Sequence, residues 1–282
     1  MRAAATTKLQ LETEMRQALE RGEFEIHYQP ILNLETREIK GFEALARWQH
    51  PERGLLSPDE FIPAAEETGL ILPLGRWILG EGCRQLSAWQ EQYAKADGLV
   101  VSVNLSAKQF LQADLAEQIR ETLETARLPA RCLKLEITES YLIENSDKAV
   151  QIMNRLRDTG VELSLDDFGT GYSSLSYLHR LPVSSLKIDR SFVSRMTESE
   201  GNSEIVRTIV KLAQTLKMDV IAEGIETEEQ LKQLNDLQCG FGQGYLFAKP
   251  MPAAMAAAFI DDNIENLSGR IDQPVINLDL NM

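Results

Sequence analysis

Strand-like and helix-like segments alternate along most of this chain, and that alternation most limits the folds open to it. Runs of β-branched and other apolar residues are repeatedly followed by segments with the period of an amphipathic helix. A strand–helix–strand crossover places its two strands parallel, so the repeat predicts a parallel sheet. Roughly seven or eight repeats favour closure into a TIM-type barrel over an open doubly wound sheet. The strand-like runs lie at 98–106, 131–140, 161–169, 184–189, 219–225 and 242–250.

The remaining segments are helices and one hairpin. Residues 23–31 and 39–48 are two extended runs joined by a short polar turn, which predicts a hairpin. The segment at 57–69 begins with Ser57, a preferred N-cap, and Pro58, a preferred first helical residue. Further helices are predicted at 8–21, 74–94, 107–126, 147–160, 203–218, 226–238 and 252–261.

This pattern also suggests boundaries. The repeat occupies residues 21–261, which we expect to form one domain. Residues 1–20 are predicted to be an N-terminal helix or linker. Residues 262–282 have no clear period and are predicted to be a C-terminal tail.

The charge balance excludes one class of partner. The formal net charge is −14, from 43 acidic and 29 basic residues. A groove for a nucleic-acid polymer needs clustered Lys and Arg, so no nucleic-acid polymer is expected as a partner. A small anionic substrate stays possible, because carboxylates that hold divalent cations reverse the local charge and attract phosphate.

Hydropathy and cysteine usage narrow the chemistry further. The longest apolar run, at 253–259, is far shorter than the ~20 residues that cross a bilayer, and the N-terminus lacks the apolar core of a secretory signal. We therefore expect a cytoplasmic location and no membrane contact by this segment, with any anchor lying elsewhere in a longer natural protein. The 3 cysteines and 3 histidines show none of the paired spacings of metal motifs. Oxygen ligands are thus expected for any bound metal.

Acidic and amide residues fall in or at the ends of the predicted strands. Asp166 and Asp167 are neighbours, although like charges repel, where an apolar run ends and glycines begin. Either they cap the next helix or they share a multivalent cation. The carboxyl ends of barrel strands meet on one face, where the catalytic residues of such barrels lie. The other polar residues in or at the ends of strands are Glu43, Asn104, Glu136, Lys187 and Glu223.

This set of side chains suits hard divalent cations. Carboxylates and an amide oxygen are good ligands for Mg²⁺ or Mn²⁺ and poor ones for Zn²⁺. Two such ions close together activate water for in-line attack on a phosphoryl group, and a carboxylate must then bridge them. Taken singly, each residue has a plainer explanation, as a helix cap or a solvated strand position. The convergence of so many strand ends favours a polar catalytic face.

The same residues lie in distinctive blocks of sequence. FEALARW at 42–48 is followed in order by VSVNLSAKQF, LEITES, DDFGTGYSS, LKIDRSFV, IAEGIET and GQGYLFAKP. In this order the blocks resemble those of EAL domains, cyclic di-GMP phosphodiesterases named for Glu43-Ala44-Leu45. The resemblance covers about residues 20–260. It implies a modified TIM (β/α)8 barrel with one antiparallel strand.

The resemblance implies an activity and a set of metal ligands. Such domains hydrolyse cyclic di-GMP to linear pGpG by a two-metal mechanism with Mg²⁺ or Mn²⁺, and Ca²⁺ is expected to inhibit. Lys187 resembles the residue that orients or deprotonates the attacking water. Glu43, Glu223 and Gln243 are similar to the residues that complete the catalytic centre. The implied metal ligands are Glu43, Asn104, Glu136, Asp166, Asp167 and Glu223.

Further positions match those that bind substrate or support the site. Gln29, Leu45 and Arg47 correspond to residues that line the cyclic dinucleotide, and Arg47 is suited to donate two hydrogen bonds to a phosphate. Glu139 resembles the glutamate that anchors the DDFGTGYSS loop, in which Gly169 and Gly171 lie. Glu226 resembles a supporting residue of the same centre.

The resemblance leaves one alternative open. Cyclic di-GMP is the expected ligand, and a homodimer is expected through the loop that follows Asp167. Degenerate EAL domains, which bind cyclic di-GMP without cutting it, usually lose one or more of these acids or the loop motif. Every motif position is intact in this sequence, which favours catalysis over a catalytically silent receptor module.

Overall fold

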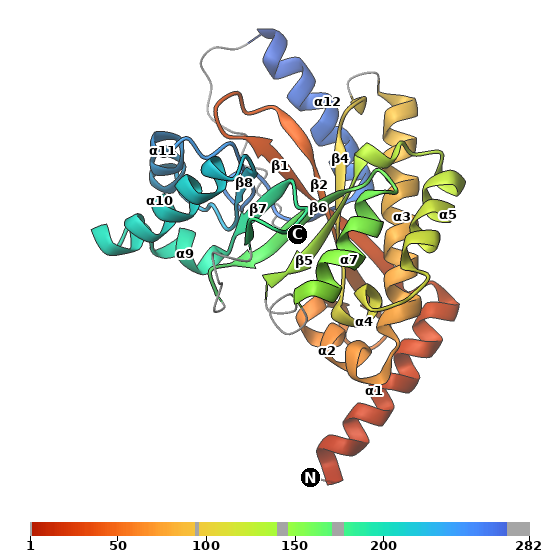
Figure 1. Ribbon diagram of the computed structural model, residues 1–282. Coiled ribbons are helices and arrows are strands. Elements are labelled where there is room, and N and C mark those ends of the chain that lie inside the picture. Colours follow the sequence, from red (N-terminus) through yellow and green to blue (C-terminus); the bar gives the residue numbers. More distant parts are fainter. Residues whose placement is uncertain (1, 94–95, 140–145, 171–177, 270–282) are drawn as a thin grey trace.

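The computed structural model describes residues 2–93, 96–139, 146–170 and 178–269, which form a sheet surrounded by helices (Figure 1). The strands are β1 (Phe24–Asn33), β2 (Ile39–His50), β3 (Gly54–Leu56), β4 (Val100–Asn104), β5 (Leu133–Thr138), β6 (Glu162–Phe168), β7 (Ser185–Ile188), β8 (Asp219–Ala222), β9 (Phe241–Gly242) and β10 (Met251–Pro252). The helices are α1 (Arg2–Arg21), α2 (Pro58–Thr68), α3 (Ile71–Gln92), α4 (Ala107–Phe110), α5 (Leu115–Ala126), η2 (Ala130–Cys132), α7 (Ser146–Arg157), α9 (Arg190–Arg195), α10 (Glu200–Thr215), α11 (Glu228–Asp236) and α12 (Ala253–Gly269).

The sheet closes into a barrel because β1 pairs with strands from both ends of the chain. Around the ring the order is β1, β2, β4, β5, β6, β7, β8 and β9, and β9 pairs back to β1. β1 is antiparallel to β2 and to β9, whereas all other neighbours in this ring are parallel. The predicted α/β fold, a modified TIM barrel with one antiparallel strand, is confirmed.

In the β1–β2 hairpin, apolar side chains and the candidate site residues lie on opposite faces of β2. Side chains alternate between the two faces of a strand, and Phe42, Ala44, Ala46 and Trp48 of β2 are all buried. Trp48 contacts the aromatic rings of Phe24 and Phe61, at centroid distances of 5.4 and 6.1 Å. The apolar positions of β2 therefore pack against β1 and α2, and Glu43, Leu45 and Arg47 share the opposite face.

Two predicted segments differ from the observed ones. The helix predicted at 107–126 is interrupted after Phe110, and Asp114 starts α5 by accepting the backbone N–H groups of Glu117 and Gln118 at 3.0 Å. The strand predicted at 242–250 ends at Gly242, and the chain then turns: Phe247 and Ala248 donate to the carbonyl of Gly244. Gly244 lies so close to the Ile225 backbone that an added Cβ would be 2.1 Å from its carbonyl oxygen, which only glycine allows.

The two ends of the barrel domain are helical. Met15 and Ala18 of α1 are fully buried in the core. The helix predicted at 252–261 is α12, which continues to Gly269. The division into 1–20, 21–261 and 262–282 stays a prediction, and residues 270–282 of the predicted tail lie outside the described part of the chain.

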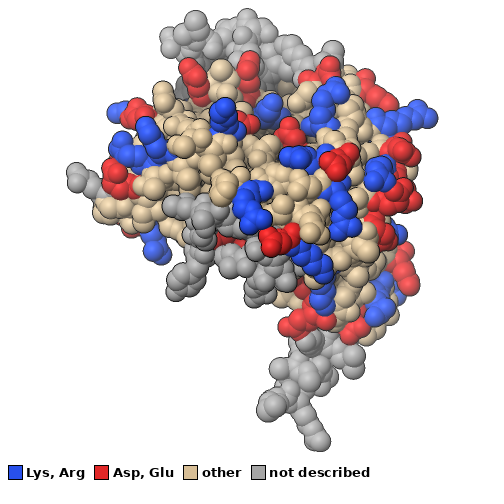
Figure 2. Space-filling model, in the orientation of Figure 1, with Lys and Arg blue, Asp and Glu red and all other residues tan. Residues whose placement is uncertain are grey.

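The described surface carries both signs of charge, and the three thiols are buried. Basic and acidic side chains are interspersed over the face shown in Figure 2. Among the described residues, no helix combines the length and apolarity of a membrane span. Cys83, Cys132 and Cys239 are free and buried, and burial raises the pKa of Cys83 and of Cys239 to about 12. These two thiols are therefore poor nucleophiles.

Candidate active site

The centre of the candidate site is the ammonium group of Lys187, which is 1% exposed in the barrel interior. Lys187 lies on β7, and the acids around it come from β2, β5, β6 and the residue after β8. Its Nζ is within ion-pair distance of four carboxylate oxygens: Glu136 Oε2 at 2.6 Å, Glu223 Oε1 at 2.7 Å, and Glu43 Oε2 and Asp166 Oδ1 at 3.3 Å. The structure thus brings together the residues that the sequence placed at the ends of separate strands.

Two amide side chains complete this cluster. Asn104, the last residue of β4, donates to Glu43 Oε1 at 2.7 Å. Gln243, the residue after β9, donates to Glu43 Oε2 at 2.6 Å and to Glu223 Oε1 at 3.1 Å. Both carboxylate oxygens of Glu43 are therefore held by hydrogen-bond donors.

Electrostatics separate the carboxyl groups of the cluster. Burial raises the pKa of Glu43, but Lys187, Gln243 and Asn104 together outweigh it and lower the pKa. Burial raises the pKa of Glu136 well above its usual range despite the attraction of Lys187. Burial also raises the pKa of Glu223 from 4.5 to about 8, again opposed by Lys187. The pKa of Glu43 is thus lowered, whereas burial dominates at Glu136 and Glu223 and raises theirs.

Lys187 itself remains an ammonium group in this arrangement. Burial lowers the pKa of Lys187, but the surrounding carboxylates, Asp166 first, reverse that effect and hold it well above its usual value. One ammonium faces four carboxylates, so three negative charges stay unbalanced when all are ionised. Buried carboxylates are stable only with paired charge, so the cluster has the electrostatics of a cation site.

Two unpaired atoms and a second group of acids fit a bound metal. Glu136 Oε1 and Gln243 Oε1 are buried and lack a hydrogen-bond partner among the described residues. Asp166, Asp167 and Glu223 each offer a carboxylate oxygen, and these three oxygens lie within 4.8 Å of one another. Such an oxygen-only set suits Mg²⁺ or Mn²⁺.

Asp167 has an unusual backbone for a residue in a strand. Its φ is 54°, in the left-handed region, and its N–H donates to Asp166 Oδ1 at 3.0 Å. Burial and then Asp166 raise the pKa of its carboxyl group. The strained backbone and the repulsion between the two acids are costs of a kind commonly found at functional sites.

The loop after Asp167 is attached to the barrel by Glu139. The Gly169 N–H donates to Glu139 Oε2 at 2.9 Å, and the role of Glu139 as a loop anchor stays a prediction. Gly169 has a φ of 100°, and an added Cβ would lie 2.8 Å from the Phe192 ring, so both conformation and space require glycine. Gly171 and the rest of this loop, with the predicted dimer contact, lie outside the described residues.

The predicted substrate residues lie on the hairpin beside Glu43. Gln29 of β1 is directly opposite Glu43 and donates to the Ala248 carbonyl at 3.2 Å. Leu45 and Arg47 follow Glu43 on the same face of β2, and both are partly buried. Burial lowers the pKa of Arg47, although Tyr245 and Asp59 oppose this effect.

Among the described residues, Glu226 forms no hydrogen bond or ion pair with the Lys187 cluster. Three residues near the predicted substrate residues were not selected from the sequence. Glu226 is exposed, and its backbone N–H donates to Gln230, so its supporting role stays a prediction. Tyr245, near Arg47, is 57% exposed, and Lys249 Nζ lies 5.5 Å from the centre of its ring. Glu25 and His27 alternate with Gln29 along β1 and were not selected. The strand period of two would have indicated that they share the face of Gln29.

Comparisons with known proteins agree with this geometry. A family model described as EAL domain matches residues 12–250. The chain is 46% identical over 256 residues to cyclic di-GMP phosphodiesterase NbdA of Pseudomonas aeruginosa, an alignment that covers 91% of this chain and 32% of that protein. It is 42% identical over 245 residues to cyclic di-GMP phosphodiesterase PdeR of Escherichia coli, with 87% and 36% covered.

A solved structure with the same fold contains a ligand. The structure of the PaMucR phosphodiesterase in complex with c-di-GMP matches this chain with a TM-score of 0.84 and 44% identity. The match covers 88% of this chain and 99% of that one. By contrast, the chain spans about a third of the length of the curated relatives it matches.

Proposed function

The chain belongs to the EAL domain family, and from this premise we propose that it is a cyclic di-GMP phosphodiesterase that produces linear pGpG. The observation that carries the proposal is the surplus of carboxylates around Lys187 on the face where barrel strands end. Relatives named cyclic di-GMP phosphodiesterases support the substrate.

We propose that two Mg²⁺ or Mn²⁺ ions are held by Glu43, Asn104, Glu136, Asp166, Asp167 and Glu223. Bound there, such ions would polarise a phosphoryl oxygen and make a water molecule nucleophilic near neutral pH. The partnerless Oε1 of Glu136 and the group formed by Asp166, Asp167 and Glu223 support this assignment. Ca²⁺ is larger and takes more ligands with looser geometry, so we expect it to support binding without turnover.

Lys187 is the proposed proton-handling residue. As an ammonium group it donates hydrogen bonds, and it would orient the attacking water. Its charge depends on the carboxylates, because burial by itself lowers its pKa. Any neutralisation of those acids moves Lys187 towards a neutral amine, which can accept a proton from water.

Substrate residues of the hairpin would position the dinucleotide over this centre. Arg47 is suited to a phosphate, because its planar guanidinium donates two parallel hydrogen bonds. Gln29 and Leu45 line the same face. Tyr245 offers an exposed ring on which a guanine base can stack.

Turnover of cyclic di-GMP tests the proposal directly. The purified protein is incubated with cyclic di-GMP and Mg²⁺, Mn²⁺ or Ca²⁺, and the products are separated by chromatography. We expect pGpG with the first two cations and none with Ca²⁺. Binding without product under all conditions would instead support the receptor module, and the absence of binding would contradict both.

A further inference from the structure

The face of the hairpin that carries Glu43 and Arg47 continues onto β1. In the β1–β2 register, Gln29 is directly opposite Glu43, His27 is opposite Leu45, and Glu25 is opposite Arg47. Alternation along each strand places all six side chains on one face. The predicted substrate residues are thus in direct contact range of two further polar residues, Glu25 and His27.

Glu25 and Arg47 do not pair, although they have opposite charges at directly opposed positions. Such cross-strand positions bring Cβ atoms to about 5 Å, which favours an ion pair. Instead, Glu25 Oε1 lies 3.0 Å from His27 Nε2. Arg47 donates to the carbonyl of its neighbour Ala46 at 2.8 Å, and no ion pair links it to an acid among the described residues.

The contact between Glu25 and His27 has one partner in the interior and one at the surface. The His27 side chain is 10% exposed and that of Glu25 is 47% exposed. A carboxylate only accepts hydrogen bonds, so His27 donates through Nε2. The nearly buried ring therefore holds one oxygen of a carboxylate that would otherwise be free to swing across the strand pair.

We propose that His27 is a positioning residue that keeps the Glu25 carboxylate away from Arg47, so that the guanidinium stays available to a phosphate of the substrate. The inference rests on the proposed function for the identity of that substrate. Without the histidine, the Glu25 carboxylate would pair with the Arg47 guanidinium and compete with the substrate phosphate for it. A partly exposed ion pair of this kind changes affinity by about two- to fivefold.

Three variants separate this role from a merely structural one. His27→Phe removes the donor and keeps an aromatic ring between Leu45 and Pro252, its two cross-strand neighbours. We expect the KM for cyclic di-GMP to rise about two- to fivefold with kcat unchanged. Glu25→Gln in the same background should restore the wild-type KM, because the competing charge is gone. His27→Gln keeps a donor and should resemble the wild type.

The control is Glu35→Gln, which removes one acid from the turn of the same hairpin and should leave KM unchanged in either background. An unchanged KM in His27→Phe would overturn the proposal. Failure of Glu25→Gln to restore KM would also overturn it, because the defect would then arise from lost packing.

A structural readout makes the test independent of turnover. In a crystal structure of His27→Phe, we expect the Glu25 carboxylate within about 4 Å of the Arg47 guanidinium. In His27→Gln, the Glu25 carboxylate should still accept a hydrogen bond from the side chain at position 27. If the Glu25 carboxylate forms no ion pair with Arg47 in His27→Phe, the positioning role is wrong, whether or not the protein hydrolyses cyclic di-GMP. If the ion pair forms but the wild type does not hydrolyse cyclic di-GMP, only the proposed function fails.

Discussion

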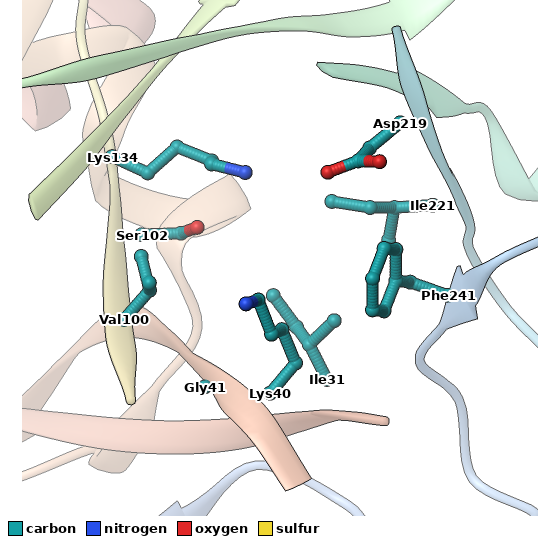
Figure 3. A pocket seen from close by; sticks show the side chains of 9 residues that line it. All are labelled: Ile31, Lys40, Gly41, Val100, Ser102, Lys134, Asp219, Ile221 and Phe241. Atoms are coloured by element: carbon teal, nitrogen blue, oxygen red, sulfur yellow. The ribbon is translucent and has the colours of Figure 1, made fainter. Parts of the chain in front are cut away.

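The two ends of the barrel each contain a buried lysine, and their surroundings differ in charge. At the carboxyl ends of the strands, Lys187 faces four carboxylates. At the opposite end, Lys134 pairs with Glu162 at 3.1 Å, and Asp219 lies across a cavity of about 20 Å³ (Figure 3). Lys40 and Ser102 also point into this cavity, which is large enough for about one water molecule.

The difference shows that a buried lysine does not by itself mark a functional site. What distinguishes the candidate site is the number of carboxylates for each ammonium group. Near Lys134 one ammonium pairs with one carboxylate, that of Glu162, so the two charges balance. Near Lys187 the acids outnumber the ammonium and raise its pKa. Among the described residues, the carboxylates around Lys187 thus have the unbalanced negative charge that a divalent cation would neutralise.

Replacing the two lysines in turn tests this contrast, and the largest effect is expected at Lys187. Lys187→Ala should lower turnover of cyclic di-GMP about 10²–10³-fold, as measured for other preorganised donors. The fold should persist, because Glu136 and Glu223 already tend to take up protons and can lose their charge. Circular dichroism checks the fold. Turnover near the wild-type rate in a folded variant would remove Lys187 from the mechanism.

Divalent cations should stabilise the folded protein through the carboxylates around Lys187 and not through the opposite end of the barrel. At a Mg²⁺ concentration about 100 times its Kd, the free energy of unfolding should rise by about 2.7 kcal/mol, measured by denaturant titration. Asp166→Asn should lose most of this gain, and Lys134→Met should keep it. An equal Mg²⁺ effect in Asp166→Asn and the wild type would place the cations elsewhere.

The acidic end should also make stability depend on pH when divalent cations are chelated. The pKa of Glu223 rises on folding from 4.5 to about 8, so the folded chain holds a proton that the unfolded chain has released. The free energy of unfolding should therefore fall as the pH rises from 4.5 to about 8, and Glu136 acts in the same direction.

Denaturant titration at several pH values checks the sign of this slope. Glu223→Gln removes the titrating group, so the slope should flatten in that variant. A wild-type stability that increases across this window would show that these carboxyls are ionised and paired in the folded protein.

The smallest effect is expected at the balanced end. The carboxylate of Glu162 is 42% exposed, so its ion pair with Lys134 should contribute at most about 1 kcal/mol. Lys134→Met keeps the apolar part of the side chain and should change stability by no more than that, with turnover of cyclic di-GMP unchanged. A tenfold loss of turnover would show that the base of the barrel supports the site.

Local patterns predicted much of the fold. Period-two and helical segments indicated the barrel, and the polar turn between 31 and 39 indicated the hairpin. The turn after Gly242 was missed, because its backbone is decided by contact with Ile225, which lies in another repeat. The break at Asp114 was missed because a helical period continues through it.

The candidate site was predicted as a set of residues but not as a set of contacts. The strand-end positions of Asn104, Asp166 and Glu223 indicated which polar groups would meet. Glu25 and His27 were not selected, although the strand period places them on the face of Gln29, and only the tertiary structure shows that Glu25 contacts His27 and not Arg47.

The sequence by itself determined that this chain makes a barrel and that one of its faces is rich in oxygen ligands, because both follow from periodicity and residue type within each repeat. The tertiary structure alone decided which charged groups come into contact. Lys187 and Glu43 are 144 residues apart and meet at 3.3 Å. Ionisation and metal affinity depend on such distances and on burial, and neither is encoded locally.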